Sequence, residues 1–374
     1  MNNIQDSQIM NFSKIGQGCM GLGGEFNRNE TRDKQDIESL KIGIEFGLTF
    51  LDTAEIYADG HSEELVGKAV QGQRDKVFIA TKFSPQNSSY AGVIAAAEAS
   101  LERLNTSHID LYQAHWPNPN IDIKETMEAL QVLVRQGKIR FIGLSNFSKR
   151  EMEDAKRCLS GENIFSNQVE YNLFDRFVEE DIAPYCREIG SRVIAYSPLD
   201  KAKETKGRGG ELLSSLAKKY DCSQTQLTLN WLVNQRKTVP IPKASNPTHI
   251  KQNAESLDFD IEQADLEQID AYFPSSPSYI DPRTIKVSLE GEGSRQVYQT
   301  IDEAILNELG HTPSPSDLAS FVLQGEPVKP VRLRPYSAAD ENYKYELIEG
   351  RVRYWAWVIA YNWEKPVPAY IRVN

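Results

Sequence analysis

Short apolar runs alternate along this chain with longer segments whose apolar residues recur every three or four positions. The first pattern is typical of buried β-strands, and the second of amphipathic helices. Eight runs qualify as strands: FSKIGQG, TFLDTAE, KVFIATK, HIDLYQAHW, IRFIGLS, NQVEYN, RVIAYSP and VPIPKA. The helical patterns between them include residues 33–47, 90–105, 123–138, 148–158 and 179–190.

This alternation predicts an α/β fold with a parallel sheet. Eight strand–helix pairs between residues 12 and 275 fit a TIM (β/α)8 barrel better than an open doubly wound sheet. The open sheet remains the minor alternative, because no GxGxxG motif follows the first strand as a dinucleotide-binding fold of that type requires.

The alternation stops at FPSSPSYIDPRT, residues 273–284, whose prolines and serines are typical of a linker. We therefore predict a barrel domain over residues 1–275, then a linker and a small α+β domain over residues 276–374. Three of the five tryptophans lie in the last 20 residues, within RVRYWAWVIAYNW. The length of 374 residues allows a large domain and a small one.

Composition narrows the class of protein. No basic leader followed by an apolar core begins the chain, and no apolar run reaches the roughly 18 residues of a membrane span, so we expect a cytoplasmic protein. The net charge of −11 disfavours DNA and anionic lipid as partners. The four cysteines are scattered without metal-ligand spacing, so we expect reduced thiols and no metal.

Polar residues at the ends of apolar strands suggest the chemistry, because TIM barrels place their active sites there. Asp52 and Tyr57 follow the second strand, Lys82 ends the third and His115 ends the fourth. A cation near a phenol lowers its pKa from about 10, so Lys82, held by Asp52, would make Tyr57 a proton donor, with His115 a second donor to a carbonyl oxygen. Each residue alone is more often structural, but four at successive strand ends favour a site.

The stretches FLDTAEIY, FIATKF, ASLERLNTSHIDLYQAHWP, IGLSNF, NQVEYN, AYSPL and IPKASNPTHIKQN occur in this order. Over residues 12–275 the chain thereby resembles the aldo-keto reductase family. The resemblance implies a TIM barrel that uses NADPH, or NADH, without a metal to interconvert an aldehyde or ketone and its alcohol. Tyr57 would be the general acid, supported by Asp52, Lys82 and His115.

The resemblance also implies a set of cofactor contacts. Ser145, Asn146 and Gln168 would hold the nicotinamide carboxamide, and Tyr196 would stack on the ring. The pyrophosphate would lie under Ser197, Pro198 and Leu199, with Lys201, Lys203, Lys206 and Arg208 either as phosphate partners or as a solvated basic loop. The adenosine end would meet Lys243, Ser245, Asn246, Gln252 and Asn253, with Lys243 facing a 2′-phosphate. His249 stands where many NADPH-dependent members have an arginine. The loss of this cation weakens the preference for NADPH over NADH without removing it.

The sequence does not identify the substrate. Trp116 and Tyr90 could line the pocket, or they could equally be packing residues.

The C-terminal stretches PVRLRP, YELIEG, GRVRYWA and PVPAYIRV are similar to the ParB N-terminal and sulfiredoxin-like fold. In that family a glycine and arginines meet nucleotide phosphates; here Gly350 and Arg353 are present, but Val352 replaces an arginine. The aromatic residues of the following helix favour a core or interface over base stacking.

Two functions therefore remain open. The first is a carbonyl reductase acting on a small molecule. The second is a nicotinamide-responsive regulatory module that acts through the ParB-like domain. The set of four polar residues favours the enzyme, because a sensor needs no proton donor.

Overall fold

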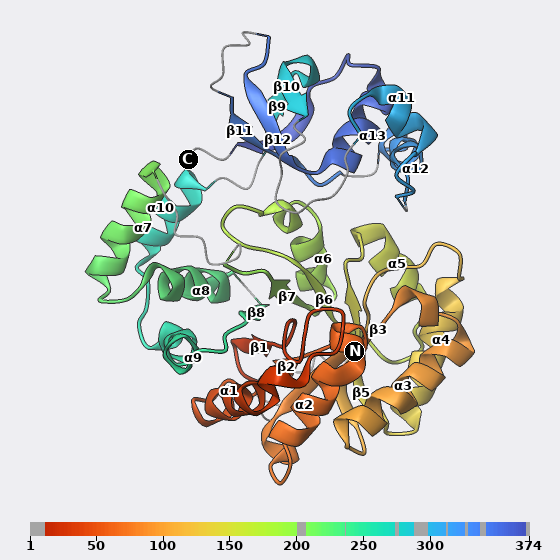
Figure 1. Ribbon diagram of the computed structural model, residues 1–374, viewed down its shortest axis with the longest axis vertical. Helices are drawn as coiled ribbons and strands as arrows, with labels where there is room; N and C mark the ends of the chain where they lie inside the picture. Colours follow the sequence, from red (N-terminus) through yellow and green to blue (C-terminus); the bar gives the residue numbers. More distant parts are fainter. Residues whose placement is uncertain are drawn as a thin grey trace. The chain divides into compact units, whose positions relative to one another are not determined.

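The computed structural model describes residues 12–199, 207–235, 237–273, 277–287, 298–311, 313–325, 328–336 and 342–371 (Figure 1). The chain divides into two compact units. The first comprises Met1–Leu173, Val178–Glu204 and Leu212–Ile269, and the second comprises Phe174–Phe177, Thr205–Glu211 and Asp270–Asn374.

The first unit is built on eight parallel strands that follow one another in chain order. They are β1 (Gly16–Gly18), β2 (Phe50–Asp52), β3 (Phe78–Phe83), β4 (Ile109–Ala114), β5 (Ile139–Ser145), β6 (Ile164–Glu170), β7 (Arg192–Tyr196) and β8 (Thr238–Pro240). The backbone N–H of Gly18 donates to Pro242 O at 3.1 Å, which joins the first strand to the segment after the last. The predicted barrel is confirmed and the open sheet is excluded.

Helices lie around these strands (Figure 1), and residues 207–211 and 270–272, at the ends of two of them, belong to the second unit. The helices include α1 (Asp33–Glu45), α2 (His61–Ala69), α3 (Tyr90–Leu104), α4 (Ile123–Arg135), α5 (Lys149–Arg157), α6 (Ile182–Glu188), α7 (Gly207–Lys219), α8 (Gln224–Asn234), α9 (Pro247–Ala254) and α10 (Gln263–Tyr272). Side-chain caps fix where several begin: Ser89 accepts a backbone hydrogen bond at α3, and Ser148 forms a capping box with Glu151 at α5.

Aromatic and aliphatic side chains from several strands form one buried cluster, to which Phe50, Phe78, Leu111, Phe165 and Ile194 contribute. Phe12 packs against it, with ring centroids 5.0 Å from Phe50 and 4.9 Å from Phe78. These side chains precede the polar residues at the strands' carboxyl ends. Packing therefore fixes the strand register on which the polar site depends.

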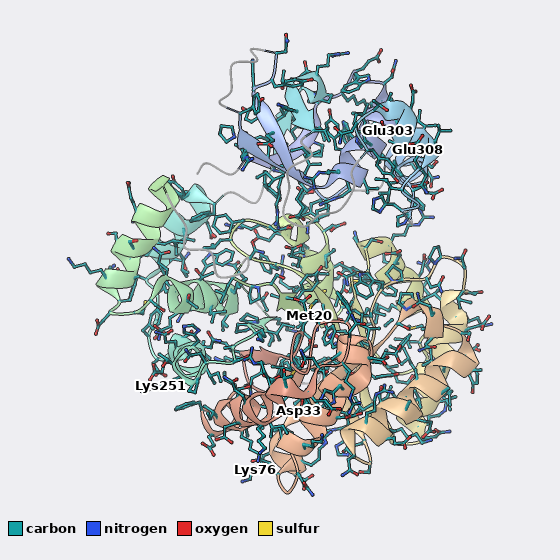
Figure 2. All side chains as sticks on the ribbon, in the orientation of Figure 1. Met20, Asp33, Lys76, Lys251, Glu303 and Glu308 are labelled. Carbon is teal, nitrogen blue, oxygen red and sulfur yellow. The ribbon has the colours of Figure 1, made fainter. Side chains whose placement is uncertain are left out.

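Charged side chains such as Lys76 and Lys251 are exposed on the outside of this unit (Figure 2). Of the four free cysteines, Cys19 and Cys186 are buried, while Cys158 and Cys222 are half-buried. None of the helices formed by the described residues is long and apolar enough to cross a membrane.

The second unit contains a five-stranded mixed sheet in the order β10-β12-β11-β13-β9. Its strands are β9 (Ser278–Ile280), β10 (Ile285–Val287), β11 (Val331–Pro335), β12 (Tyr345–Glu349) and β13 (Val367–Ile371), with helices α11 (Ile301–Leu306), α12 (Pro315–Leu323) and α13 (Arg351–Tyr361). Strand β9 lies within the proline- and serine-rich stretch that the sequence favours as a linker, and it pairs antiparallel with β13.

The aromatic residues of α13 belong to the core of this sheet. Tyr354 and Trp355 are buried, and Trp357 and Trp363 pack against the same cluster. The Trp355 indole N–H donates to Tyr298 O at 3.0 Å, which satisfies its polar group inside the core. Of the two uses that the sequence allows for these rings, the core is the one observed.

Candidate active site

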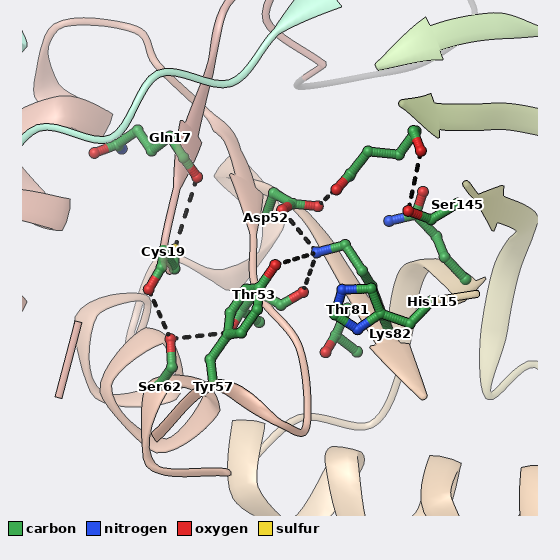
Figure 3. Close-up of polar contacts among 12 residues, drawn as sticks. Gln17, Cys19, Asp52, Thr53, Tyr57, Ser62, Thr81, Lys82, His115 and Ser145 are labelled. Atoms are coloured by element: carbon green, nitrogen blue, oxygen red, sulfur yellow. Dashed lines mark hydrogen bonds and ion pairs between the residues drawn. The ribbon is translucent and has the colours of Figure 1, made fainter. Parts of the chain in front are cut away.

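The carboxyl ends of the barrel strands gather the polar residues that the sequence singles out. Asp52 is the last residue of β2, Lys82 is the next-to-last residue of β3, and His115 directly follows β4. Tyr57 begins the short 3-10 helix η3 (Tyr57–Gly60) beyond β2. Parallel strands carry all four residues to one end of the barrel, where Figure 3 shows them around one point.

Lys82 is the centre of this group, and its side chain is completely buried. Its ammonium donates to Asp52 Oδ2 at 2.8 Å, to the backbone carbonyl of Thr53 at 2.7 Å and to the Tyr57 hydroxyl at 3.4 Å (Figure 3). Three donors thus meet three oxygen acceptors, and the charge is balanced by one carboxylate. Asp52 and Thr53 fix the direction in which Lys82 approaches the phenol.

His115 lies beside Tyr57 without sharing its hydroxyl. The two rings are edge-on with centroids 5.8 Å apart, and among the described residues no hydrogen bond joins them. The His115 Nδ1 atom is buried and has no hydrogen-bond partner within the described part of the chain. Trp116 stacks on the His115 ring at 3.8 Å and is 40% exposed. The Tyr57 hydroxyl is therefore bonded to Lys82, while the His115 ring lies beside the Tyr57 ring.

The electrostatics of Tyr57 differ from the expectation drawn from residue types alone. Burial raises the pKa of Tyr57, and the Lys82 ammonium lowers it by less, so the phenol stays protonated at neutral pH. Burial is the largest single effect and opposes the charge on Lys82, but Asp52 and Tyr57 together outweigh it and raise the pKa of Lys82. Burial and Lys82 together lower the pKa of His115 to about 2, so that imidazole is neutral.

Side chains from β5, β6 and β7 lie next to this group. Asn146 donates to His115 O at 3.0 Å and to Ser145 Oγ at 3.1 Å, and it accepts from the Tyr196 hydroxyl at 3.0 Å. Gln168 donates from Nε2 to Asp52 Oδ1 at 2.7 Å. Gln168 is therefore bonded directly to the Asp52–Lys82 pair, whereas Asn146 links Ser145 and Tyr196 to the backbone of His115.

The remaining residues implied by the resemblance lie after β7 and β8. Ser197 is exposed and Pro198 is buried, while Lys243 is exposed and the buried Ser245 hydroxyl has no partner among the described residues. Asn246 caps α9, Gln252 is half-buried and Asn253 is buried within that helix; Leu199 is half-buried and His249 is exposed. Lys201, Lys203 and Lys206 lie outside the described residues, as does the Arg208 side chain.

Several residues that sequence reasoning missed support the site. The Thr53 carbonyl accepts from Lys82, and a backbone atom leaves no signal in the sequence. Glu55 accepts from the backbone N–H of Ser84 at 2.6 Å and from Asn87 at 2.8 Å. Glu63 is completely buried and pairs with Arg103. Its signal was available, because Glu63 follows Tyr57 by only six positions at the start of a helix.

No group of three or more His, Cys, Asp and Glu side chains in the described ranges is placed to hold a metal ion. The chemical groups of this site are instead a phenol, an ammonium, a carboxylate and a neutral imidazole. Such a set can donate a proton to an oxygen on which negative charge develops.

Comparison with known proteins assigns the barrel region to one family. Residues 14–273 match the model of the aldo/keto reductase family. The chain is 37% identical over 276 residues to methylglyoxal reductase YeaE from Escherichia coli, which covers 73% of this chain and 95% of that protein. It resembles the solved aldo-keto reductase of Klebsiella pneumoniae in complex with NADPH, with a TM-score of 0.65 and 36% identity, covering 70% of this chain and 92% of that one. The thermostable aldo-keto reductase Tm1743, solved with the inhibitor epalrestat, gives a TM-score of 0.67 and 36% identity over 70% and 95% of the two chains.

Proposed function

Because this chain belongs to the aldo/keto reductase family, we propose that it reduces small aldehydes and ketones with NADPH, with methylglyoxal as a substrate. The observation that carries the proposal is the buried Lys82, which is bonded to Asp52 on one side and to the Tyr57 hydroxyl on the other. A buried charge is costly to maintain, and here it is directed at a phenol.

The residues of the site fit a nicotinamide cofactor. Asn146 and Gln168 carry amide groups, Tyr196 offers a flat ring, and the buried Ser245 hydroxyl and the exposed Lys243 lie after β8. Lys243 supplies a positive charge for a 2′-phosphate, which favours NADPH over NADH. When bound, the cofactor supplies the hydride that reaches the carbonyl carbon.

The chain's own residues then handle the proton and the substrate oxygen. Tyr57 holds a proton that its raised pKa keeps in place until negative charge develops on the carbonyl oxygen. Lys82 offsets the charge left on the phenol, and Asp52 keeps Lys82 charged and oriented. A neutral His115 donates a hydrogen bond from one nitrogen to the same oxygen. Trp116, which stacks on His115 and is 40% exposed, would line the substrate's path. Tyr90 is 42% exposed at the start of α3 and has no contact with the four residues of the site.

A Tyr57→Phe substitution tests the proposed role of the phenol. We expect kcat for methylglyoxal to fall by about 10²- to 10⁴-fold, which is the usual contribution of a general acid. NADPH binding, followed by quenching of tryptophan fluorescence, should change little because the ring is retained. A Tyr57→Phe enzyme with wild-type turnover would show that another group donates the proton.

For the second unit we infer a ParB N-terminal or sulfiredoxin-like domain. The support is the order of its elements, in which β11 and β12 precede α13 and β13 follows it. Gly350 occupies the N-cap of α13, as the phosphate-binding turn of that family requires. Arg353, however, donates to the carbonyls of Lys329 and Pro330, and Val352 packs against the core. These contacts favour a structural or interaction role over triphosphate binding.

A further inference from the structure

The backbone directly after Tyr57 is left-handed at three successive residues. Ala58 has φ 50°, Asp59 has φ 55° and Gly60 has φ 81°. Residues other than glycine pay about 1–2 kcal/mol to adopt this conformation. Backbone strain of this kind persists only where the surrounding structure holds it. Here the strained residues directly follow Tyr57.

Two contacts hold this turn from outside. The backbone N–H of Ala58 donates to Glu25 O at 2.8 Å. On the other side the Arg103 side chain from α3 lies against Gly60, where an added Cβ would come within 2.6 Å of Arg103 Cδ. The Arg103 stem therefore covers the turn at the residue where the chain leaves it.

Arg103 is itself held by Glu63, the third residue of α2. Its Nε donates to Glu63 Oε2 at 2.6 Å, and its Nη2 donates to Ser100 Oγ at 3.2 Å. The other oxygen of Glu63 accepts from Thr81 Oγ1 at 2.6 Å, and Thr81 immediately precedes Lys82 in β3. Glu63 is 0% exposed, so both of its oxygens are satisfied inside the protein. One carboxylate thus ties α2, α3 and β3 together behind the catalytic group.

We propose that Arg103 and Glu63 are positioning residues for Tyr57: their ion pair holds the left-handed turn in place and fixes the hydroxyl against Lys82. This inference rests on the proposed function, in which Tyr57 donates the proton. The pair touches neither the Tyr57 hydroxyl nor Lys82, so its effect on turnover passes through the turn and through Thr81.

A second ion pair in the same barrel provides a matched control. Arg74 donates from Nη2 to the buried Asp110 at 2.7 Å, so it also joins a partly exposed arginine to a buried carboxylate. Arg74 precedes β3 and Asp110 is the second residue of β4, so this pair lies near the amino ends of the strands, opposite the site. Removing either arginine takes one cation from a buried carboxylate, although Asp110 keeps Arg140 at 2.8 Å. Only Arg103 borders the Tyr57 turn.

The experiment compares Arg103→Ala with Arg74→Ala in the full-length protein. For Arg103→Ala we expect kcat for methylglyoxal to fall by about 10- to 100-fold, because an ångström-scale displacement of a catalytic group costs this much. KM and NADPH affinity should stay within about twofold, and the solvent deuterium isotope effect on kcat should rise as proton transfer becomes slower. Arg74→Ala should keep kcat within about threefold. Arg103→Lys, which retains the stem and the charge, should restore most of the loss.

Should Arg103→Ala fail to fold, Glu63→Gln provides the second variant, since it keeps the side-chain shape and removes the charge. We expect a smaller loss in kcat, about 5-fold or more, with the same rise in the isotope effect. Unchanged kcat and isotope effect in the variant that folds, or an equal loss in Arg74→Ala, would overturn the positioning role. If Tyr57→Phe is inactive in that case, the proposed function still stands. If Tyr57→Phe retains full turnover, both the proposed function and this inference fail.

Discussion

Lys82 shows how one residue sets the state of its neighbours. Its three hydrogen bonds leave it no freedom to turn, and its charge lowers the pKa of both Tyr57 and His115. Burial acts in opposite directions on the two rings, because it disfavours the phenolate and the imidazolium alike. Over the same range of pH, Tyr57 is therefore a protonated phenol and His115 is a neutral imidazole.

The pH dependence of carbonyl reduction follows from these directions. The acid form of Tyr57 is required, and its raised pKa moves the alkaline loss of kcat above about pH 10, the ordinary value for tyrosine. With the pKa of His115 at about 2, no step in kcat should occur near pH 6.5, the ordinary value for histidine. Initial rates with saturating NADPH and methylglyoxal between about pH 5 and 10 should therefore show neither step.

Comparison with a His115→Gln variant serves as the control for that profile. It should lower kcat without changing the shape of the curve, because the imidazole does not titrate in this range. An acidic limb near pH 6.5 that disappears in His115→Gln would show instead that the imidazolium takes part.

At the scale of elements, the turn η3 places two residues other than glycine, Ala58 and Asp59, in a left-handed backbone conformation. Asp59 is exposed at φ 55°, and its side chain makes no hydrogen bond or ion pair within the described part of the chain, whereas Gly60 at φ 81° lies against Arg103. The two positions share a left-handed backbone but differ in the space around them. They therefore separate conformational strain from packing.

Substitution at these two positions should change stability in opposite directions. Asp59→Gly relieves the left-handed strain at an exposed site and should raise the free energy of unfolding by about 0.5–1 kcal/mol. Gly60→Ala adds the strain and a methyl group 2.6 Å from Arg103 Cδ, so it should lower stability by more than about 1 kcal/mol. Urea denaturation followed by circular dichroism measures both, and a destabilised Asp59→Gly would show that Asp59 makes a stabilising contact.

On the scale of the whole molecule, the second unit can be tested for nucleoside triphosphate binding. Three cations near α13 already have carboxylate partners: Lys329 and Arg332 pair with Asp175 of the same unit at 2.6 and 2.8 Å, and Arg353 pairs with Glu349 at 3.7 Å. Arg351 is the exception, because its buried Nε and Nη2 atoms have no partner among the described residues. A triphosphate would have to displace these carboxylates. Because this displacement costs free energy, we expect a triphosphate to bind weakly.

We therefore expect no saturable binding of ATP by this unit up to about 1 mM, which corresponds to about −4 kcal/mol. Calorimetric titration of the full chain, with the barrel first saturated with NADPH, isolates the second unit. A tighter interaction that disappears in Arg353→Ala would establish a nucleotide site there and revive the regulatory alternative.

The sequence predicts some features of the whole molecule well and others poorly, for physical reasons. Strands such as β4 are short runs of buried residues that a polar residue directly follows, so both the barrel and the position of His115 could be recognised. Strand β9 could not, because it has only three residues, Ser278 and Tyr279 are exposed, and its pairing comes from β13. The net direction of the Tyr57 pKa and the Glu63–Arg103 pair depend on burial and on contacts 40 residues apart, which local patterns do not carry.

Asp52 gives one carboxylate oxygen to Lys82 and the other to Gln168, which lies 116 positions away. A single side chain thus serves both the proton donor and the proposed nicotinamide holder. In evolutionary terms this is epistasis built into the fold: a change at any one of the three positions alters the fitness of changes at the other two.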